Sequence, residues 1–227
     1  MKDIALILTD TARSKVYLAM LEMYNLLPNY IIYLRGRKRS KIKVRKINNS
    51  KNININFEFS EKLKELPLDY EIINTKDIHN KYVIKILKNR KEKVFIYSGY
   101  GGVILKKHIL AIGKKFLHVH GGYIPNYKGS TTNYYSILEK NKMGASAIFL
   151  NEKIDSGPII DRKIFSPPKK KYEIDYFYDS YLRGLVLVNL LKKFKRTQRI
   201  KSKKISQKNY KNYFIIHPVL KHIALLK

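Results

Sequence analysis

An apolar strand that ends in two histidines and continues into a glycine-rich turn is the feature that most constrains this chain. Residues 116–129 read Phe-Leu-His-Val-His-Gly-Gly-Tyr-Ile-Pro-Asn-Tyr-Lys-Gly. Alternate side chains of a strand point to the same face, so His118 and His120 are expected on one side of it. Glycines allow a turn to approach another group closely. The segment therefore predicts ionisable side chains at the end of a strand, beside a loop built for close contact.

A single carboxylate follows in a second tight turn. Asp155 precedes Ser156 and Gly157, and the turn lies between the apolar segments 145–150 and 158–165, which we expect to be paired strands. In an open α/β sheet, ligands bind beyond the carboxyl ends of the strands. A proton-transfer group, a close-approach loop and a carboxylate in such places indicate an enzyme.

The first residues of the chain predict a β-α-β unit. Residues 3–9 are apolar almost throughout, as in a central parallel strand. Residues 14–27 predict a helix that Pro28 stops, and residues 30–34 predict a second strand. Such units build doubly wound sheets. We therefore expect an α/β fold with an open, mostly parallel sheet, helices on both faces, and a mixed arrangement toward the C-terminal half.

Later segments continue this alternation of strands and helices. Further strands are predicted at residues 93–97 and 116–119, and further helices at 78–88, 103–112, 133–140 and 175–194. Residues 35–56 are basic and rich in asparagine, which favours a variable connection. We expect a catalytic domain over residues 1–194 and a short basic extension over residues 195–227 that packs on the core or trails from it.

Composition sets the broad class of the protein. A hydrophobic content of 44% indicates a folded globule. No apolar run approaches the roughly 20 residues of a membrane span, and Asp10 and Arg13 follow the first apolar stretch where a signal peptide would be cleaved. The sequence has no cysteine, which excludes disulfides and thiolate metal sites. We therefore expect a cytoplasmic protein.

The formal net charge of +30 has two explanations. One is an anionic partner, either a nucleic acid or an anionic membrane face. The other is drift in an A/T-rich genome, because lysine supplies 37 of the 47 basic residues and accompanies abundant isoleucine, asparagine and tyrosine. Phosphate and base recognition favours arginine, which is the minority of the basic residues here. We therefore expect no specific nucleic-acid partner.

The order of elements and the motifs resemble the folate-dependent formyltransferase family. This family includes glycinamide ribonucleotide formyltransferase, the catalytic domain of methionyl-tRNA formyltransferase and sugar N-formyltransferases. Its signature is Asn-x-His, then Pro-Ser-Leu-Leu-Pro, a basic residue and Gly, and later Asp-x-Gly. The matching stretches here are residues 118–125, Lys128-Gly129 and 155–157. The resemblance covers residues 94–165 well and the first β-α-β unit weakly, and it implies a Rossmann-like sheet.

The resemblance also implies a reaction and a set of site residues. The formyl donor would be 10-formyltetrahydrofolate and the acceptor a primary amine. The catalytic residues would be His118, His120 and Asp155. Cofactor contacts would come from Gly102, Val103, Ile104, Leu105, Gly122, Tyr123, Ile124 and Pro125. The acceptor would meet Lys128, Ser130, Thr131 and Thr132.

Each catalytic candidate suits one part of formyl transfer. An imidazole titrates near neutrality, so His120 suits proton handling. Asp155 suits orienting that imidazole or accepting the amine proton. His118 stands where the family has asparagine, and its N–H can serve as the oxyanion donor. The family's proline and serine are replaced by Gly121 and Gly122, which a loop that works through its backbone can accommodate.

Other interpretations of these residues stay open. The histidines can be ordinary structural residues, or the chain can be a catalytically decayed relative or a basic nucleic-acid-binding protein. His118, His120 and a carboxylate could also hold iron or zinc. Because the sequence places no third strong ligand beside them, we expect no metal.

The acceptor follows by elimination. Methionyl-tRNA formyltransferase carries an additional C-terminal β-barrel, for which the basic tail here is too short. Glycinamide ribonucleotide formyltransferase has a glycine-containing phosphate loop that residues 9–14 do not match. We therefore expect a nucleotide-linked amino sugar, as in surface-polysaccharide synthesis, with the other two acceptors as alternatives. A homodimer is a further possibility.

Overall fold

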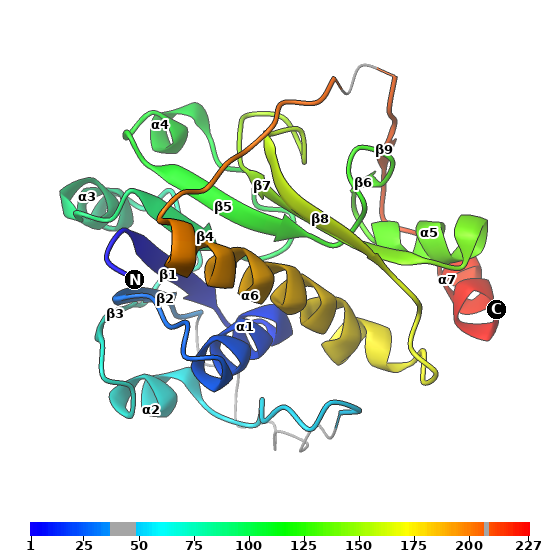
Figure 1. Ribbon diagram of the computed structural model, residues 1–227, viewed down its shortest axis with the longest axis horizontal. Coiled ribbons are helices and arrows are strands. Elements are labelled where there is room, and N and C mark those ends of the chain that lie inside the picture. The colour runs from blue at the N-terminus through cyan, green and yellow to red at the C-terminus, as the bar shows by residue number, and fades with distance from the viewer. Residues whose placement is uncertain (37–48, 207–208) are drawn as a thin grey trace. The chain divides into compact units, whose positions relative to one another are not determined.

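The computed structural model describes residues 1–36, 49–206 and 209–227. It confirms the predicted α/β class, with one seven-stranded, mostly parallel sheet in the order β3-β2-β1-β4-β5-β7-β8 and helices around it (Figure 1). The chain divides into two compact units, residues 1–117 and 118–227.

The first unit contains the parallel part of the sheet. Its strands are β1 (Ile4–Thr9), β2 (Tyr30–Leu34), β3 (Asp69–Ile73), β4 (Val94–Tyr97) and the start of β5 (Lys115–His120). Its helices are α1 (Ala12–Met23), α2 (Phe59–Lys64), α3 (Lys81–Asn89) and α4 (Lys107–Leu110). β1 pairs with β2 on one side and β4 on the other, in parallel. All six residues of β1 are buried, as the unbroken apolar run predicts for a central strand.

Local sequence explains where the first helix begins. The side chain of Thr11 accepts a hydrogen bond from the Ser14 backbone N–H, and so caps α1 at its N-terminus. The Thr9 hydroxyl donates to the Ser98 carbonyl at 2.9 Å, which ties the end of β1 to the end of β4. The carboxyl ends of these two strands therefore lie together.

The second unit contains the antiparallel part of the sheet and the C-terminal helices. Its elements are β6 (Lys128–Gly129), α5 (Thr132–Lys140), β7 (Met143–Phe149), β8 (Ile159–Phe165), a π-helical turn (Ile174–Tyr178), α6 (Asp179–Thr197), β9 (Asn212–Tyr213) and α7 (Pro218–Leu226). β7 and β8 form the predicted pair, which is antiparallel. α6 packs on both strands, and α5 packs on β7 and α7 (Figure 1).

Several predicted boundaries were wrong. The helix predicted over residues 103–112 is confined to α4, because the chain from Gly102 to Lys106 is non-helical and Gly102 has φ +79°. The C-terminal helix begins later than residue 175, after the π-helical turn, and ends at Thr197. Five short elements, α2, β3, β6, β9 and α7, were not predicted. Most of the connection predicted over 35–56 falls outside the described residues.

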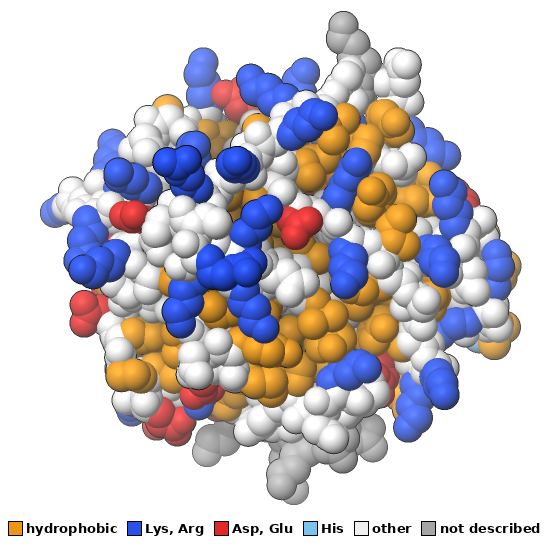
Figure 2. Space-filling model, viewed as in Figure 1, with side chains coloured by type: hydrophobic (Ala, Val, Ile, Leu, Met, Phe, Trp, Pro, Cys, Tyr) orange, Lys and Arg blue, Asp and Glu red, His pale blue; other side chains and the backbone are white. Residues whose placement is uncertain are grey.

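The surface carries the charge that the composition requires. Figure 2 shows Lys and Arg side chains scattered over the visible face, with few Asp and Glu side chains among them. None of the helices in the described part of the chain combines the length and the apolar character needed to cross a bilayer.

Candidate active site

His120 and Asp155 form a pair at the end of β5. The His120 side chain is almost fully buried, and its Nδ1 lies 3.2 Å from Asp155 Oδ2. Asp155 lies in the turn after β7 with φ +46°, a left-handed conformation that aspartate tolerates better than most residues. The turn thus directs its carboxylate at the imidazole. Two of the three residues predicted to be catalytic are therefore in contact.

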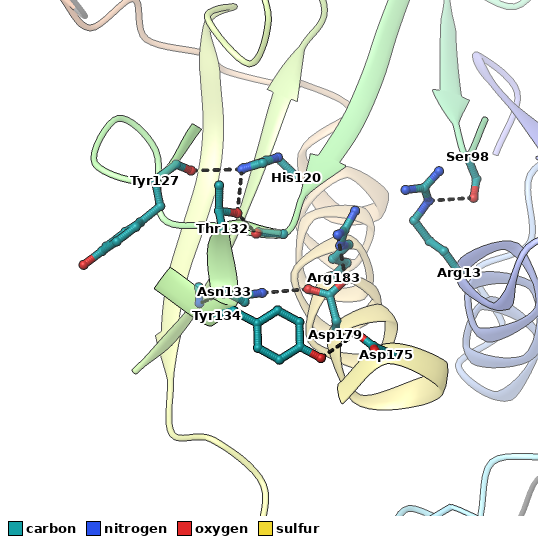
Figure 3. A network of polar contacts seen from close by, with 12 residues as sticks. Arg13, Ser98, His120, Tyr127, Thr132, Asn133, Tyr134, Asp175, Asp179 and Arg183 are labelled. Atoms are coloured by element: carbon teal, nitrogen blue, oxygen red, sulfur yellow. Dashed lines mark hydrogen bonds and ion pairs between the residues drawn. The ribbon is translucent and has the colours of Figure 1, made fainter. Parts of the chain in front are cut away.

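The other ring nitrogen of His120 also has partners. Nε2 lies 2.9 Å from the Tyr127 carbonyl oxygen (Figure 3). A carbonyl can only accept, so Nε2 carries the proton of this hydrogen bond. The Thr132 hydroxyl lies 3.3 Å from the same nitrogen and donates to the Gly121 carbonyl. The loop and the start of α5 therefore fix the orientation of the ring.

The two oxygens of Asp155 differ in their surroundings. Oδ2 contacts His120 and also accepts the Gly129 backbone N–H at 2.9 Å. Within the described residues, Oδ1 makes no hydrogen bond, and the side chain is 12% exposed. Oδ1 is therefore the oxygen left to accept a proton or a hydrogen bond from a bound molecule.

Close packing explains the two glycines that follow His120. A Cβ on Gly122 would lie 2.5 Å from the Tyr127 carbonyl oxygen and 2.7 Å from His120 Nε2. A Cβ on Gly121 would lie 2.3 Å from Arg183 Nη2. Neither glycine has a positive φ. Gly122 therefore needs glycine for space, because it faces a backbone carbonyl, whereas at Gly121 the close atoms are the ends of the Arg183 and Asp179 side chains.

Residues of α5 and α6 form a second polar network, which supports the loop that follows β5. Asn133 donates to Asp179 Oδ1 at 2.7 Å and accepts the Gly144 N–H at 2.7 Å. Arg183 pairs with Asp179 at 2.6 Å and lies over Gly121 (Figure 3). Sequence reasoning missed these residues, although the i, i+4 spacing of Asp179 and Arg183 is a recognisable helix pair.

The loop between β5 and β6 is also attached to the core. The buried Ser146 hydroxyl donates to the Gly122 carbonyl at 2.7 Å and accepts the Ile124 N–H at 3.0 Å. The Ile124 side chain is fully buried and packs with Ile148 and Ile159. Ile124 can therefore offer a ligand only its backbone.

The residues predicted to meet the acceptor have different surroundings. Lys128 is only 4% exposed, whereas Ser130 is exposed. The Thr131 hydroxyl accepts the Ile216 N–H at 2.8 Å, and the Thr132 hydroxyl is part of the His120 cluster. His118 is half-buried on β5.

The predicted cofactor residues before α4 belong to the first unit. Gly102 is exposed, Ile104 is 49% exposed and Leu105 is buried. The same unit carries a polar cluster after β1, in which Asp10 accepts the Tyr33 hydroxyl and the Gly36 N–H. Burial and the hydrogen bond to Asp10 raise the pKa of Tyr33 above its ordinary value.

Arg13 reaches the end of β4 within this first unit. Its Nε donates to the Ser98 hydroxyl at 3.2 Å, as Figure 3 shows. Nowhere in the described residues do three potential metal ligands gather.

Sequence comparison places the chain among one-carbon transferases. The family model described as "Formyl transferase" matches residues 31–166. A methionyl-tRNA formyltransferase of Finegoldia magna is 26% identical over 100 residues, which are 44% of this chain and 32% of the relative. The corresponding protein of Buchnera aphidicola is 35% identical over 91 residues, 40% of this chain and 27% of the relative. The matched segment thus spans about a third of these relatives or less.

Solved structures share the fold. A sugar N-formyltransferase from a Shewanella species is 15% identical with a TM-score of 0.59, covering 100% of this chain and 87% of that one. An N-formyltransferase of Helicobacter canadensis is 12% identical with a TM-score of 0.57, covering 94% of this chain and 71% of that one. The family model matches more than half of the residues of this chain, and the chain therefore belongs to the formyl transferase family.

Proposed function

We propose that this protein transfers a formyl group from 10-formyltetrahydrofolate to a primary amine. The observation that carries the proposal is the buried His120–Asp155 pair, in which one carboxylate oxygen has no partner in the described structure. Formyl transfer requires a base for the attacking amine, a donor for the developing oxyanion and a proton for the leaving folate nitrogen. The pair supplies the first of these.

Each of the three candidate catalytic residues has its own role in the proposed formyl transfer. The amine nitrogen attacks the formyl carbon, and Asp155 Oδ1 accepts the proton that the amine loses. His120, held by Tyr127 and Asp155, orients the carboxylate and supports its charge. His118 donates to the oxyanion, a type of contact worth about 3–4 kcal/mol when removed in other enzymes. The oxyanion then re-forms the carbonyl as the bond to the folate nitrogen breaks, and that nitrogen takes up the proton that Asp155 accepted.

The donor would contact Gly102 to Leu105 and Gly122 to Pro125. Exposure of Gly102 and Ile104 fits a flat, apolar ring system. Because the Ile124 side chain is in the core, contacts from the second segment would come from its backbone and from Tyr123.

For the acceptor we propose a nucleotide-linked amino sugar. The Shewanella protein is a sugar N-formyltransferase with a similar fold over the whole length of this chain. The Helicobacter canadensis structure holds folinic acid and dTDP-3-aminofucose. The exposed Ser130 near the pair offers a hydroxyl to such a sugar.

Methionyl-tRNA is the second candidate acceptor. It is favoured by the sequence relatives, which are methionyl-tRNA formyltransferases at 26% and 35% identity, and by the net charge of +30. A third acceptor, glycinamide ribonucleotide, has less support because the first loop of the chain lacks glycine.

Folate binding is the first test. Folinic acid at about 100 times its dissociation constant should stabilise the protein by about 2.7 kcal/mol, a rise in Tm of about 5–10 °C for a chain of this size. Formyl transfer is then measured with an aminated nucleotide sugar, methionyl-tRNA and glycinamide ribonucleotide. His120→Gln and Asp155→Asn should retain the folate-induced shift and lose at least about 100-fold in turnover. No shift at saturating folinic acid would contradict the proposal.

A further inference from the structure

The C-terminal arm, residues 209–227, returns to the loop that contacts His120 and Asp155. Its short strand β9 pairs in parallel with β6, with Asn212 opposite Lys128 and Tyr213 opposite Gly129. The Ser130 N–H donates to the Tyr213 carbonyl at 2.9 Å. Backbone pairing therefore joins the arm to the residues that directly follow Tyr127.

Side chains strengthen this attachment. The rings of Tyr213 and Tyr127 are stacked, with centroids 5.6 Å apart. Their hydroxyls donate to the two oxygens of the exposed Glu139, at 3.0 Å from Tyr213 and 2.8 Å from Tyr127. The ring of Tyr135 packs on Tyr213 at 4.6 Å. One carboxylate on α5 thus holds a tyrosine of the arm beside a tyrosine of the loop.

The rest of the arm is anchored to the same helix. The Thr131 hydroxyl accepts the Ile216 N–H at 2.8 Å. Lys221 on α7 pairs with Asp175, which also accepts the Tyr134 hydroxyl. These contacts hold α7 against α5 and keep β9 in register.

The residues that the arm contacts are those whose backbone contacts the catalytic pair. The Tyr127 carbonyl accepts from His120 Nε2, and the Gly129 N–H donates to Asp155 Oδ2, each at 2.9 Å. A Cβ on Gly129 would lie 2.1 Å from the Tyr213 carbonyl oxygen. Segment 127–129 therefore has the pair on one side and Tyr213 on the other, with no room for a side chain at position 129.

We propose that Tyr213 is a positioning residue for the His120–Asp155 pair and acts through Tyr127 and Gly129. The arm is then part of the active-site architecture rather than a trailing extension. Tyr213 need not touch substrate, because it sets the two backbone groups that orient the imidazole and the carboxylate. This inference deepens the proposed function and rests on it for its kinetic consequence, but the geometry can be tested without activity.

The test compares Tyr213→Ala and Tyr213→Phe with Tyr210→Ala, a matched change of an exposed tyrosine in the same arm. The first readout is the NMR signals of the His120 ring nitrogens, assigned with His120→Gln, in protein without ligands. We expect Tyr213→Ala to shift these signals and Tyr213→Phe, which keeps the stacked ring, to restore most of the wild-type pattern. Tyr210→Ala should leave them unchanged.

Kinetics supply the second readout. Tyr213→Ala should lower kcat by about 10- to 100-fold, because displacement of catalytic groups by about an ångström can cost 100-fold, with a smaller change in KM. Glu139→Ala, at an exposed position, removes the acceptor shared by both hydroxyls. If Tyr213→Ala does not fold, Glu139→Ala takes its place, and we expect it to shift the His120 signals and lower kcat in the same direction.

Unaltered His120 signals in both Tyr213→Ala and Glu139→Ala would overturn the proposal, as would equal shifts in Tyr210→Ala. If wild-type protein transfers no formyl group to any acceptor, the proposed function fails, while the NMR comparison still decides whether the arm positions the pair. A lower Tm with wild-type His120 signals would reduce the arm to a structural element.

Discussion

At His120, Nε2 and its partners leave no space for a side chain at position 122. Gly122→Ala would place a Cβ within 2.7 Å of Tyr127, Thr132 and His120. At least one of these contacts must then shift, and overpacking of this kind costs about 1–3 kcal/mol. We therefore expect Gly122→Ala to lower the free energy of unfolding by that amount and to abolish formyl transfer.

Gly101→Ala is the matched control, because a Cβ there would meet nothing within 4 Å. Its free energy of unfolding should stay within about 0.5 kcal/mol of wild type. Urea denaturation and turnover are measured for both variants. Equal effects at the two positions would show that the space beside His120 has no special role.

His118 is the residue at which this chain departs from the family signature. His118→Asn restores the asparagine, an amide donor whose charge does not change near neutral pH. We expect retained or increased turnover and a flatter pH profile of kcat/KM. The pH profiles of the wild-type protein and of His118→Ala are measured for comparison. Complete loss of activity in His118→Asn would mean that the imidazole has a chemical role of its own, and metal analysis would follow.

At the scale of elements, β6 and β9 are joined by two tyrosines whose hydroxyls share Glu139. Burial and the hydrogen bond to Glu139 raise the pKa of Tyr127 to about 12, and the same causes raise the pKa of Tyr213 to about 12. The ordinary value is 10.0. A raised pKa for an acid means that its neutral form is favoured in the folded state. The stability that these hydroxyls contribute is therefore complete below about pH 10 and is lost as pH rises through about 12.

We therefore expect the free energy of unfolding to fall between about pH 10 and about pH 12, and the fall to be smaller in the Tyr127→Phe, Tyr213→Phe double variant. Other buried tyrosines, such as Tyr33, also contribute, so the difference between proteins is the informative quantity. Tyr210→Phe, at an exposed position, should retain the wild-type slope. Identical slopes in all three proteins would contradict a role for these hydroxyls in holding the arm.

At the scale of the whole molecule, the net charge is +30, and Lys and Arg side chains are scattered over the face that Figure 2 shows. Dispersed lysines attract any polyanion, and such attraction is screened by salt. We expect binding to tRNA and to bulk RNA to be equally weak at about 150 mM salt. Fluorescence anisotropy across a salt series measures this, and selective tRNA binding would favour methionyl-tRNA as the acceptor.

The exposed, basic C-terminal end of α6 provides a sharper test of whether RNA binding is specific. Lys193, Lys195 and Arg196 are replaced together by glutamate, and Lys85, Lys88 and Lys91 of the first unit provide a charge-matched control. Nonspecific attraction predicts equal losses of RNA affinity in the two variants. A loss confined to the α6 variant would identify an RNA contact surface there.

Sequence alone determined the fold class and predicted His120 and Asp155 as candidate catalytic residues. Unbroken apolar runs such as 3–9 identified central strands, because strands buried on both faces are made mostly of apolar residues. The His-x-His strand and the Asp155 turn identified the pair, because strand alternation and tight-turn chemistry are local properties. The short helices and strands were missed, since elements of two to nine residues take their stability from packing rather than from their own sequence.

Only the tertiary structure decided what surrounds the pair. Nothing in the sequence near Tyr127 indicates that Tyr213 stacks on it, because the two are joined through Glu139 and a two-residue strand pair formed across more than eighty residues of chain. The need for glycine at position 122 likewise comes from atoms of Tyr127, Thr132 and His120. Long-range packing is set by the whole chain at once, so a local pattern predicts which residues are reactive but not which residues hold them in place.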